Sequence, residues 1–216
     1  MLHDLSKTSS ILSQFVSELR DVELQKERMR FRRNMERIGE IIGYELSKQL
    51  GYTKVPVQTP LAIAPSERLA EVPVLGTVLR AGLALHQGLL NFFDGADVAF
   101  VSAYRKHRAD GSFEIKLEYV SCPSLSGRIL VLSDPMLATG SSLVMTVKEL
   151  RKQWQPSKIH IVTAIGCIPG VEHVTKELPD VDIWAAAIDP ELNSKAYIVP
   201  GLGDAGDLAF GEKVQY

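Results

Sequence analysis

The stretch 128–142 constrains the fold of this chain more than any other part of its sequence. It opens with an apolar run, 129–132, in which β-branched residues alternate with leucine, and this run has the length of a buried strand. Asp134 stands where that strand is expected to end, and the small residues 138–142 lead directly into a helical pattern. Backbone N–H groups in such a loop and at the helix N-terminus favour an anion. The stretch therefore predicts a phosphate site. The carboxylate of Asp134 would repel a phosphate group, because both are negative, so it is better suited to bind sugar hydroxyls nearby.

Strands and helices are expected to alternate along most of the chain. Strands are predicted at 72–79, 97–104, 129–132, 158–165 and 181–188, and helices at 83–93, 142–154 and 169–178. This alternation is typical of an α/β fold, in which a mostly parallel sheet is flanked by helices. The length of 216 residues is consistent with one large core, so we predict a single domain over 1–216.

The N-terminal quarter predicts helices rather than strands. Helices are expected at 4–20 and 21–50, which together make an N-terminal helical extension over 1–52, with Gly51 as a C-cap. Met35, Ile38, Ile42 and Leu46 form an apolar stripe along the second helix. Arginine and glutamate alternate on the same helix, which favours a solvated face or a subunit contact over an RNA-binding patch.

Two further segments predict extended structure. Residues 55–62 are bounded by Pro56 and Pro60, which suits an edge strand. Residues 105–111 form a polar turn, and the loose alternation of 113–120 predicts a strand that returns as a hairpin.

Composition excludes several classes of function. The net charge of -2 gives no basic excess, so no nucleic-acid partner is expected. No apolar run approaches the ~20 residues of a membrane-spanning helix, and the first residues lack the pattern of a signal peptide. Cys122 and Cys167 lack metal-ligand spacing, so reduced thiols are expected. These features predict a cytoplasmic protein without a membrane partner.

The C-terminal tail, 197–211, combines flexibility with apolar anchors. It contains glycine at 201, 203, 206 and 211, together with Ile198, Val199, Leu202 and Phe210. Glycine alone would favour disorder, but the apolar residues favour an ordered loop. We therefore expect a loop whose backbone approaches a ligand.

Three polar sites are expected at the carboxyl ends of strands, where open α/β sheets bind ligands. They are Arg80 with the Ala-Gly turn that follows it, Arg105, and the stretch 134–142. Arginines bind phosphate groups through a planar fork of donors. A sugar with a phosphate at one end and a diphosphate at the other would fit this pattern. An ordinary surface or helix-capping role for Arg80 is equally compatible with the sequence.

Three motifs of this sequence resemble motifs of one known family. The stretch 134–142 resembles the phosphate loop of the type I phosphoribosyltransferases, and Pro135-Met136-Leu137 is similar to the uracil branch of that family. Residues 78–83 resemble the pyrophosphate loop, and 197–213 resemble the base-binding C-terminus. The match runs in order from about residue 19 to residue 213 and covers most of the chain.

The resemblance implies an activity and an anatomy. The activity is the conversion of uracil and 5-phosphoribosyl 1-pyrophosphate (PRPP) to UMP and pyrophosphate in pyrimidine salvage. The fold would carry a β-hairpin hood over 104–124 and a uracil-binding C-terminal loop over 197–216. The hood normally carries acidic residues, and this chain has Lys106-His107 there.

The resemblance also implies roles for particular residues. Those with a catalytic role would be Asp134, Arg80, Arg105 and Asp204. Those that bind PRPP would be Arg80, Arg105, Asp134, Pro135, Met136, Leu137, Ala138, Thr139, Gly140, Ser141, Ser142 and Asp204. Those that bind uracil, mainly through backbone groups, would be Ile198, Gly203, Asp204 and Ala205. No residue stands out as the general base.

The family further implies Mg²⁺ as cofactor, held mainly by PRPP and water and without a direct protein ligand. It implies a homo-oligomer, either a dimer or a tetramer, and GTP as an effector of some members. Ser141 stands where the family has a second glycine, and Leu208 where it has a basic residue. A PRPP-sensing regulator or a non-catalytic paralogue on the same fold is the alternative. The complete tail motif and the lack of a basic face favour the enzyme.

Overall fold

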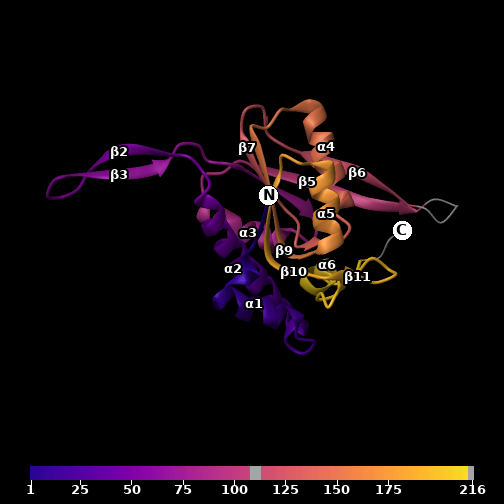
Figure 1. The fold of residues 1–216 in the computed structure, drawn as a ribbon. Coiled ribbons are helices and arrows are strands. Elements are labelled where there is room, and N and C mark those ends of the chain that lie inside the picture. The colour runs from indigo at the N-terminus through magenta and orange to yellow at the C-terminus, as the bar shows by residue number, and fades with distance from the viewer. Residues whose placement is uncertain (108–112, 214–216) are drawn as a thin grey trace.

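The structure is a computed structural model that describes residues 1–107 and 113–213, without the side chains of 103–118 (Figure 1). Its core is an eight-stranded sheet in the order β1-β10-β9-β7-β4-β5-β6, with β8 paired to β9. The strands are β1 (Leu2–Asp4), β4 (Val74–Leu79), β5 (Val98–His107), β6 (Phe113–Ser121), β7 (Ile129–Ser133), β8 (Met136–Leu137), β9 (Lys158–Cys167) and β10 (Asp182–Asp189). Among the described strands of this sheet, β5 and β6 are antiparallel and the other pairs are parallel. The predicted mostly parallel α/β sheet is confirmed.

Helices cover both faces of the sheet (Figure 1). The helices on one face are α1 (Ile11–Arg20), α2 (Arg28–Ser47) and α3 (Leu83–Phe92), and those on the other are α4 (Ser141–Gln153) and α5 (Ile168–Glu177). Neighbouring strand residues point to opposite faces, so Val131 packs with the first group and Leu130 with the second. Because both faces are covered, the central strands β4, β7 and β9 are buried along nearly their whole length instead of alternating between buried and exposed residues.

The N-terminal region is mostly helical, as predicted, but it is more interrupted than the sequence suggests. Short 3-10 turns at Leu5–Lys7 and Leu24–Lys26 break the expected helices, and α2 ends in a C-cap at Lys48 instead of Gly51. The apolar stripe of α2 is buried within this chain's own core. The stripe is therefore not available for a contact with another subunit.

A projecting hairpin replaces the single edge strand expected at 55–62. Strand β2 (Tyr52–Gln58) pairs antiparallel with β3 (Ile63–Leu69), and the ribbon extends away from the sheet (Figure 1). The predicted strand is confirmed for 55–58, which belong to β2, and wrong for 59–62, which form the turn between the two strands. Pro56 lies opposite Pro65, where a two-stranded ribbon tolerates the missing N–H groups.

Strand β5 continues through residue 107, so the turn predicted at 105–111 is wrong for its first three residues. Arg105 lies within the strand opposite Ile115 instead of beyond the strand end. The antiparallel pairing of β5 with β6 confirms the predicted return strand. The side chain of Arg105 and those of Lys106 and His107 lie outside the description, as do residues 108–112.

The tail is more regular than the expected loop. Strand β12 (Ile198–Val199) pairs with β11 (Glu191–Leu192), and 205–210 form helix α6 (Ala205–Phe210). The helix begins at Asp204, whose side chain accepts a hydrogen bond from the N–H of Asp207 at 3.0 Å. This N-cap accounts for a short helix in a glycine-rich segment.

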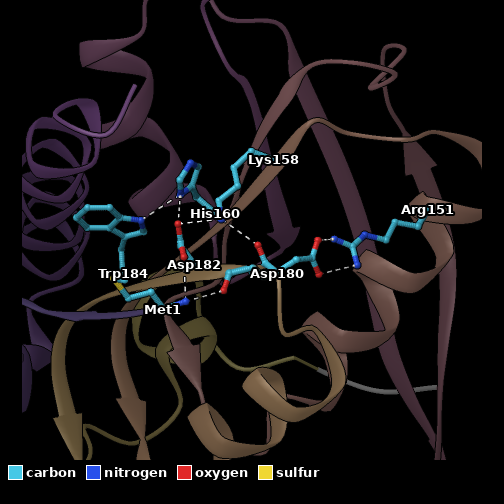
Figure 2. Close-up of polar contacts among 8 residues, drawn as sticks. Met1, Arg151, Lys158, His160, Asp180, Asp182 and Trp184 are labelled. Atoms are coloured by element: carbon cyan, nitrogen blue, oxygen red, sulfur yellow. Dashed lines mark hydrogen bonds and ion pairs between the residues drawn. The ribbon is translucent and has the colours of Figure 1, made fainter. Parts of the chain in front are cut away.

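Polar contacts fasten the N-terminal strand to the sheet (Figure 2). The carboxylate of Asp182 lies 2.9 Å from the amino group of Met1 and 3.0 Å from Lys158 Nζ. Trp184 Nε1 donates to His160 Nδ1 at 3.3 Å beside this cluster. Strand β1 was not predicted, because three residues are too few to show an alternating pattern.

The cysteines are reduced, and no described helix is suited to a membrane. Cys122 and Cys167 are both free thiols, as predicted. Cys167 is buried and donates to the carbonyl oxygen of Ala138 at 2.9 Å. No helix within the described ranges is both long and apolar enough to cross a membrane.

Candidate active site

A cavity of about 510 Å³ lies where the carboxyl ends of β4 and β7 meet the C-terminal tail. Its wall is formed by Leu79, Arg80, Ala81, Ser102, Asp134, Met136, Ala138, Ser142, Lys195, Ala196, Tyr197, Ile198, Gly203, Asp204, Ala205, Gly206 and Lys213. The volume is typical of pockets for small molecules. The location agrees with the rule that α/β sheets bind ligands at the carboxyl ends of their strands.

The turn after β4 carries the first cation of the site. Arg80 lines the cavity, and its Nη2 donates to the carbonyl oxygen of Gly211 at 3.0 Å and to Asp207 Oδ1 at 3.3 Å. Gly82 closes the turn, where a Cβ would clash with Thr77 Oγ1 and lie 2.7 Å from the carbonyl oxygen of Val78. The close approach of the backbone to the sheet therefore requires glycine at this position.

The end of β7 places Asp134 in the cavity wall. The backbone N–H of Met136 donates to its Oδ1 at 3.4 Å. Burial raises the pKa of Asp134 to about 7, and the hydrogen bond from Met136 lowers it by less. Asp134 is half-buried and faces the cavity, so its carboxylate would be stabilised by donors that a ligand brings, such as sugar hydroxyls.

The phosphate loop ends at an open helix N-terminus. Gly140 has φ +74°, precedes Ser141, the first residue of α4, and has no side chain to cap the helix. Thr139 Oγ1 accepts from the N–H of Ser141 at 3.3 Å, and no described side chain accepts from the next two N–H groups of the helix. Its first N–H groups are therefore suited to an anion. Ser141 has no positive φ, so the serine found in place of a second glycine is compatible with the loop.

The tail supplies the opposite wall of the cavity, and an ion pair between the half-buried Arg20 and the buried Asp189 holds it there. Asp189 is 5% exposed and makes a two-pronged contact with Arg20 at 2.7 and 2.8 Å. Asp189 also accepts from the N–H of Gly201 at 2.9 Å, and Arg20 donates to the carbonyl oxygen of Gly201 at 2.9 Å. These contacts fix the chain direction between Ile198 and Gly203.

The cavity wall is mixed in charge but contains more cations than acids. The basic residues in the wall are Arg80, Lys195 and Lys213, and the acidic ones are Asp134 and Asp204. Lys213 Nζ lies 3.7 Å from Asp204 Oδ2. A ligand with several negative charges would therefore meet a favourable potential on this wall.

Most of the predicted ligand residues converge on this cavity. Those in its wall are Arg80, Asp134, Met136, Ala138, Ser142, Ile198, Gly203, Asp204 and Ala205. Those that belong to the phosphate loop without lining the cavity are Pro135, Leu137, Thr139, Gly140 and Ser141. Arg105 cannot be placed in it, because its side chain is outside the description. Their individual roles stay predictions.

Several wall residues were not predicted as ligands. Tyr197 and Lys213 lie inside the quoted tail motif, so their place in that motif could have identified them. Ala196 has φ +61°, in the left-handed region. An alanine rarely adopts this conformation, so the sequence gives no sign of it. Ser102 and Lys195 come from separate segments, and no pattern in the sequence connects them to the site.

The wall is compatible with the expected Mg²⁺. Among the described residues, no group of three or more histidine, cysteine, aspartate or glutamate side chains could form a metal site. Mg²⁺ commonly uses one or two carboxylates and takes its remaining ligands from substrate phosphates and water. Asp134 and Asp204 are two carboxylates of the wall that fit this minor contribution.

Comparisons with known proteins agree with the geometry. The sequence model of the uracil phosphoribosyltransferase family matches residues 6–212. The uracil phosphoribosyltransferase of Porphyromonas gingivalis is 47% identical over 211 residues, which cover 97% of this chain and 98% of that protein. The enzyme of the same name from Methanococcus maripaludis is 40% identical over 209 residues and covers 94% and 87% of the two chains.

A solved structure shows the same fold over the full length. The AQ2163 protein of Aquifex aeolicus superimposes with a TM-score of 0.87 at 29% identity, and the match covers 100% of both chains. The family match spans nearly the whole sequence, and it includes the phosphate loop, the turn after β4 and the tail. The chain therefore belongs to the uracil phosphoribosyltransferase family of pentosyltransferase enzymes.

Proposed function

We propose that the cavity between the sheet and the tail is the site where this enzyme converts uracil and PRPP to UMP and pyrophosphate. One observation carries the proposal: a helix N-terminus, a half-buried carboxylate, an arginine and the tail segment meet around one space. Each of these groups matches one part of the two substrates. The activity itself follows from the family of the chain.

The donor half of the site would bind PRPP at three points. The 5'-phosphate would lie on the backbone of 138–142 at the start of α4, where N–H groups favour an anion. Asp134 would accept hydrogen bonds from the ribose hydroxyls. Arg80 would bind the diphosphate, and we assign Arg105 the same role from the family resemblance.

The acceptor half would read uracil with the backbone of the tail. Ile198, Gly203, Asp204 and Ala205 all line the cavity, which supports this assignment. A rigid backbone edge can match the alternating donors and acceptors of uracil. The same edge would place a donor against the amino group of cytosine, which would disfavour that base.

The chemistry requires stabilisation of charge more than proton transfer. As the diphosphate leaves, the ribose gains oxocarbenium-like positive charge and the leaving group gains negative charge. Fixed cations such as Arg80 lower the barrier because they stabilise the leaving group. Mg²⁺, when bound with PRPP, would supply further positive charge to the diphosphate. Asp204 would lie beside the reacting sugar, and we assign no general base.

Three finer points complete the proposal. We propose a cytoplasmic protein, in keeping with two free thiols. We propose a homo-oligomer, either a dimer or a tetramer, because Leu61 and Ile63 on the β2–β3 hairpin are 96% and 66% exposed. GTP activation follows from the family alone. Light scattering of the purified protein, before and after Leu61→Lys with Ile63→Lys, tests the oligomer.

A base panel tests the function. The purified protein is incubated with Mg²⁺, PRPP and, in separate reactions, uracil, cytosine, orotate, hypoxanthine or xanthine. We expect UMP from uracil and no product from the other bases. Product from hypoxanthine without product from uracil would contradict the assignment of the base. PRPP binding without any product would instead support the regulator or the non-catalytic paralogue.

The acceptor assignment has its own test in Ala205→Pro. Ala205 is the first residue of α6, a position where proline fits the helix. The substitution removes one backbone N–H. We expect a folded protein with weaker uracil binding and unchanged PRPP binding. Unchanged uracil affinity in the folded variant would contradict backbone recognition.

A further inference from the structure

Arg80 lines the cavity, and its guanidinium group also contacts helix α6 of the tail. Its Nη2 donates to the carbonyl oxygen of Gly211 at 3.0 Å and lies 3.3 Å from Asp207 Oδ1. Both partners belong to α6 or its C-cap. An arginine expected on the donor side is therefore fastened to the helix that begins in the acceptor wall.

Both hydrogen bonds between Arg80 and the α6 region come from one nitrogen of the guanidinium group, Nη2. Within the described part of the chain, Nε and Nη1 of Arg80 make no hydrogen bond. A guanidinium group has five N–H donors in a planar fork. With Nη2 held by α6, the edge that carries the remaining donors keeps a defined orientation. A diphosphate is suited to that free edge, because guanidinium binds phosphate oxygens in pairs.

Helix α6, which contacts Arg80, is itself fixed to the rest of the fold. Arg32 Nη1 donates to the carbonyl oxygen of Ala209 at 2.7 Å, which ties α6 to α2. The N-cap of Asp204 fixes the other end of the helix. Gly206 packs against Ala81, where a Cβ on the glycine would lie 3.5 Å from the Cβ of Ala81. The helix thus contacts both the turn of Arg80 and the rest of the fold.

We propose that Asp207 is a positioning residue that orients Arg80 for the diphosphate of PRPP. This inference rests on the proposed role of Arg80 in binding the donor. Asp207 acts through Arg80 and does not touch the reacting atoms. Because α6 begins at Asp204 and Ala205 in the acceptor wall, the same contact links the donor arginine to the base pocket.

The alternative is a purely structural role for Asp207. A carboxylate in the first turn of a helix favours the helix through its dipole, and Asp207 occupies that place in α6. Such a role would lower stability when Asp207 is removed. It would not make the effect on kinetics depend on the residue at position 80. A double-mutant cycle separates the two roles.

The test compares Asp207→Ala, Asp207→Asn, Arg80→Lys and the double variant Asp207→Ala/Arg80→Lys. Initial rates are measured with PRPP and uracil varied in turn, and melting temperatures are recorded alongside. Arg80 and Asp207 are partly exposed, so we expect Asp207→Ala to raise KM for PRPP about fivefold. Asp207→Asn keeps an acceptor oxygen and should stay within about twofold of the wild type. On the Arg80→Lys background, Asp207→Ala should add less than about twofold, because lysine lacks the fork.

Two results would overturn the inference. One is a KM for PRPP that Asp207→Ala leaves unchanged while Arg80→Lys raises it. The other is an equal effect of Asp207→Ala on both backgrounds. If Arg80→Lys itself leaves KM for PRPP and kcat unchanged, the proposed role of Arg80 is wrong, and the inference that rests on it falls too. If the alanine variant does not fold, Asp207→Leu takes its place in the same cycle, because leucine is close to aspartate in size, favours a helix and has no acceptor oxygen.

Discussion

At the scale of single residues, ionised Asp134 lowers the stability of the fold and has a proposed role in binding PRPP. Burial raises its pKa to about 7, so the carboxyl group changes charge near neutral pH. The ionised form accepts stronger hydrogen bonds from ribose hydroxyls than the neutral form does. We expect affinity for PRPP to rise between about pH 6 and pH 8 as Asp134 ionises. Titrations of PRPP binding across this range measure the effect.

Asp134→Asn provides the control, because the amide has the same shape and does not ionise. The phosphates of PRPP also titrate near neutrality, so the informative quantity is the difference in pH dependence between the two proteins. The sign for stability is opposite: an acid with a raised pKa destabilises the fold as pH rises from its ordinary range to about 7. We therefore expect Asp134→Asn to melt higher at pH 8 and to turn over more slowly. Parallel pH profiles of PRPP binding would remove Asp134 from the donor site.

Gly140 is a second residue whose role can be isolated. Its φ of +74° disfavours a side chain, and a Cβ would lie 2.7 Å from Val174 Cγ2 and 3.0 Å from the carbonyl oxygen of Gly170. We expect Gly140→Ala to lower the free energy of unfolding by about 3 kcal/mol. Gly127 shares the φ of +74° and has nothing within 4 Å, so Gly127→Ala should cost only about 1 kcal/mol. Denaturant unfolding of both variants measures these costs, and equal losses would contradict the clash at Gly140.

Part of the site could be predicted at this scale. Asp134 and Arg80 follow apolar runs, so their places at strand ends are visible in the sequence. Arg105 was expected at such an end, but β5 continues past it because β6 extends the pairing. Lys195 and Ser102 reach the cavity from segments far apart in the chain, and only the folded arrangement joins them.

At the scale of elements, the strands and helices of the sheet followed their hydrophobic patterns, and the exceptions have identifiable causes. Strand β1 is too short to show a pattern. The sequence predicts an edge strand only at 55–62 within the β2–β3 hairpin, because Pro56, Pro60 and Pro65 interrupt the alternation. Helix α6 is hidden by glycine, although Asp204 carries an N-cap signal that could have been used.

The tail element depends on a contact that no local pattern reveals. Asp189 at the end of β10 is 5% exposed and binds both Arg20 and the N–H of Gly201. Arg20→Ala would leave this buried carboxylate without its cation. We expect a loss of about 2 kcal/mol in stability, because Arg20 itself is only partly buried, and weaker uracil binding as the tail loosens. Thermal unfolding and the KM for uracil measure the two effects.

Lys148→Ala serves as the matched control for Arg20→Ala. Lys148 pairs with Glu177 on the surface, where its side chain is half exposed. Such a pair contributes about 0–1 kcal/mol, and it lies on the α4–α5 side of the molecule. The control should leave KM for uracil unchanged. A KM for uracil that Arg20→Ala does not raise would show that Asp189 needs no cation to hold the tail.

At the scale of the whole molecule, the order of the strands in the sheet cannot be predicted from local sequence patterns. Periodicity indicates which segments form strands but not which of them become neighbours. Strand β1 lies beside β10 at the opposite end of the chain, and β4 lies between β5 and β7. These pairings depend on contacts between distant segments. The family resemblance supplied the general architecture that local patterns could not.

Two histidines buried in the core should lower the stability of the molecule in acid. His86 and His160 are 2% and 3% exposed, and burial lowers the pKa of each to about 4. Trp184 donates to Nδ1 of His160, so that nitrogen is unprotonated in the fold. The unfolded chain binds protons near pH 6.5, before the folded chain does. Stability should therefore be lost as pH falls from about 6.5 towards 4, by up to about 1.4 kcal/mol per pH unit for each histidine.

His86→Leu tests this account, because neither ring nitrogen of His86 has a hydrogen-bond partner among the described residues. Leucine removes two unsatisfied polar atoms and the titrating group together. We expect stability at pH 7 to be maintained or raised by about 1 kcal/mol, and the loss of unfolding free energy between pH 6.5 and 4 to be smaller than in the wild type by up to about 1.4 kcal/mol per pH unit. Gln87→Leu, at the exposed neighbouring position of α3, should leave the slope unchanged. If His86→Leu loses stability on acidification as steeply as the wild type, then the acid sensitivity arises from other groups, and burial of His86 does not disfavour its protonation.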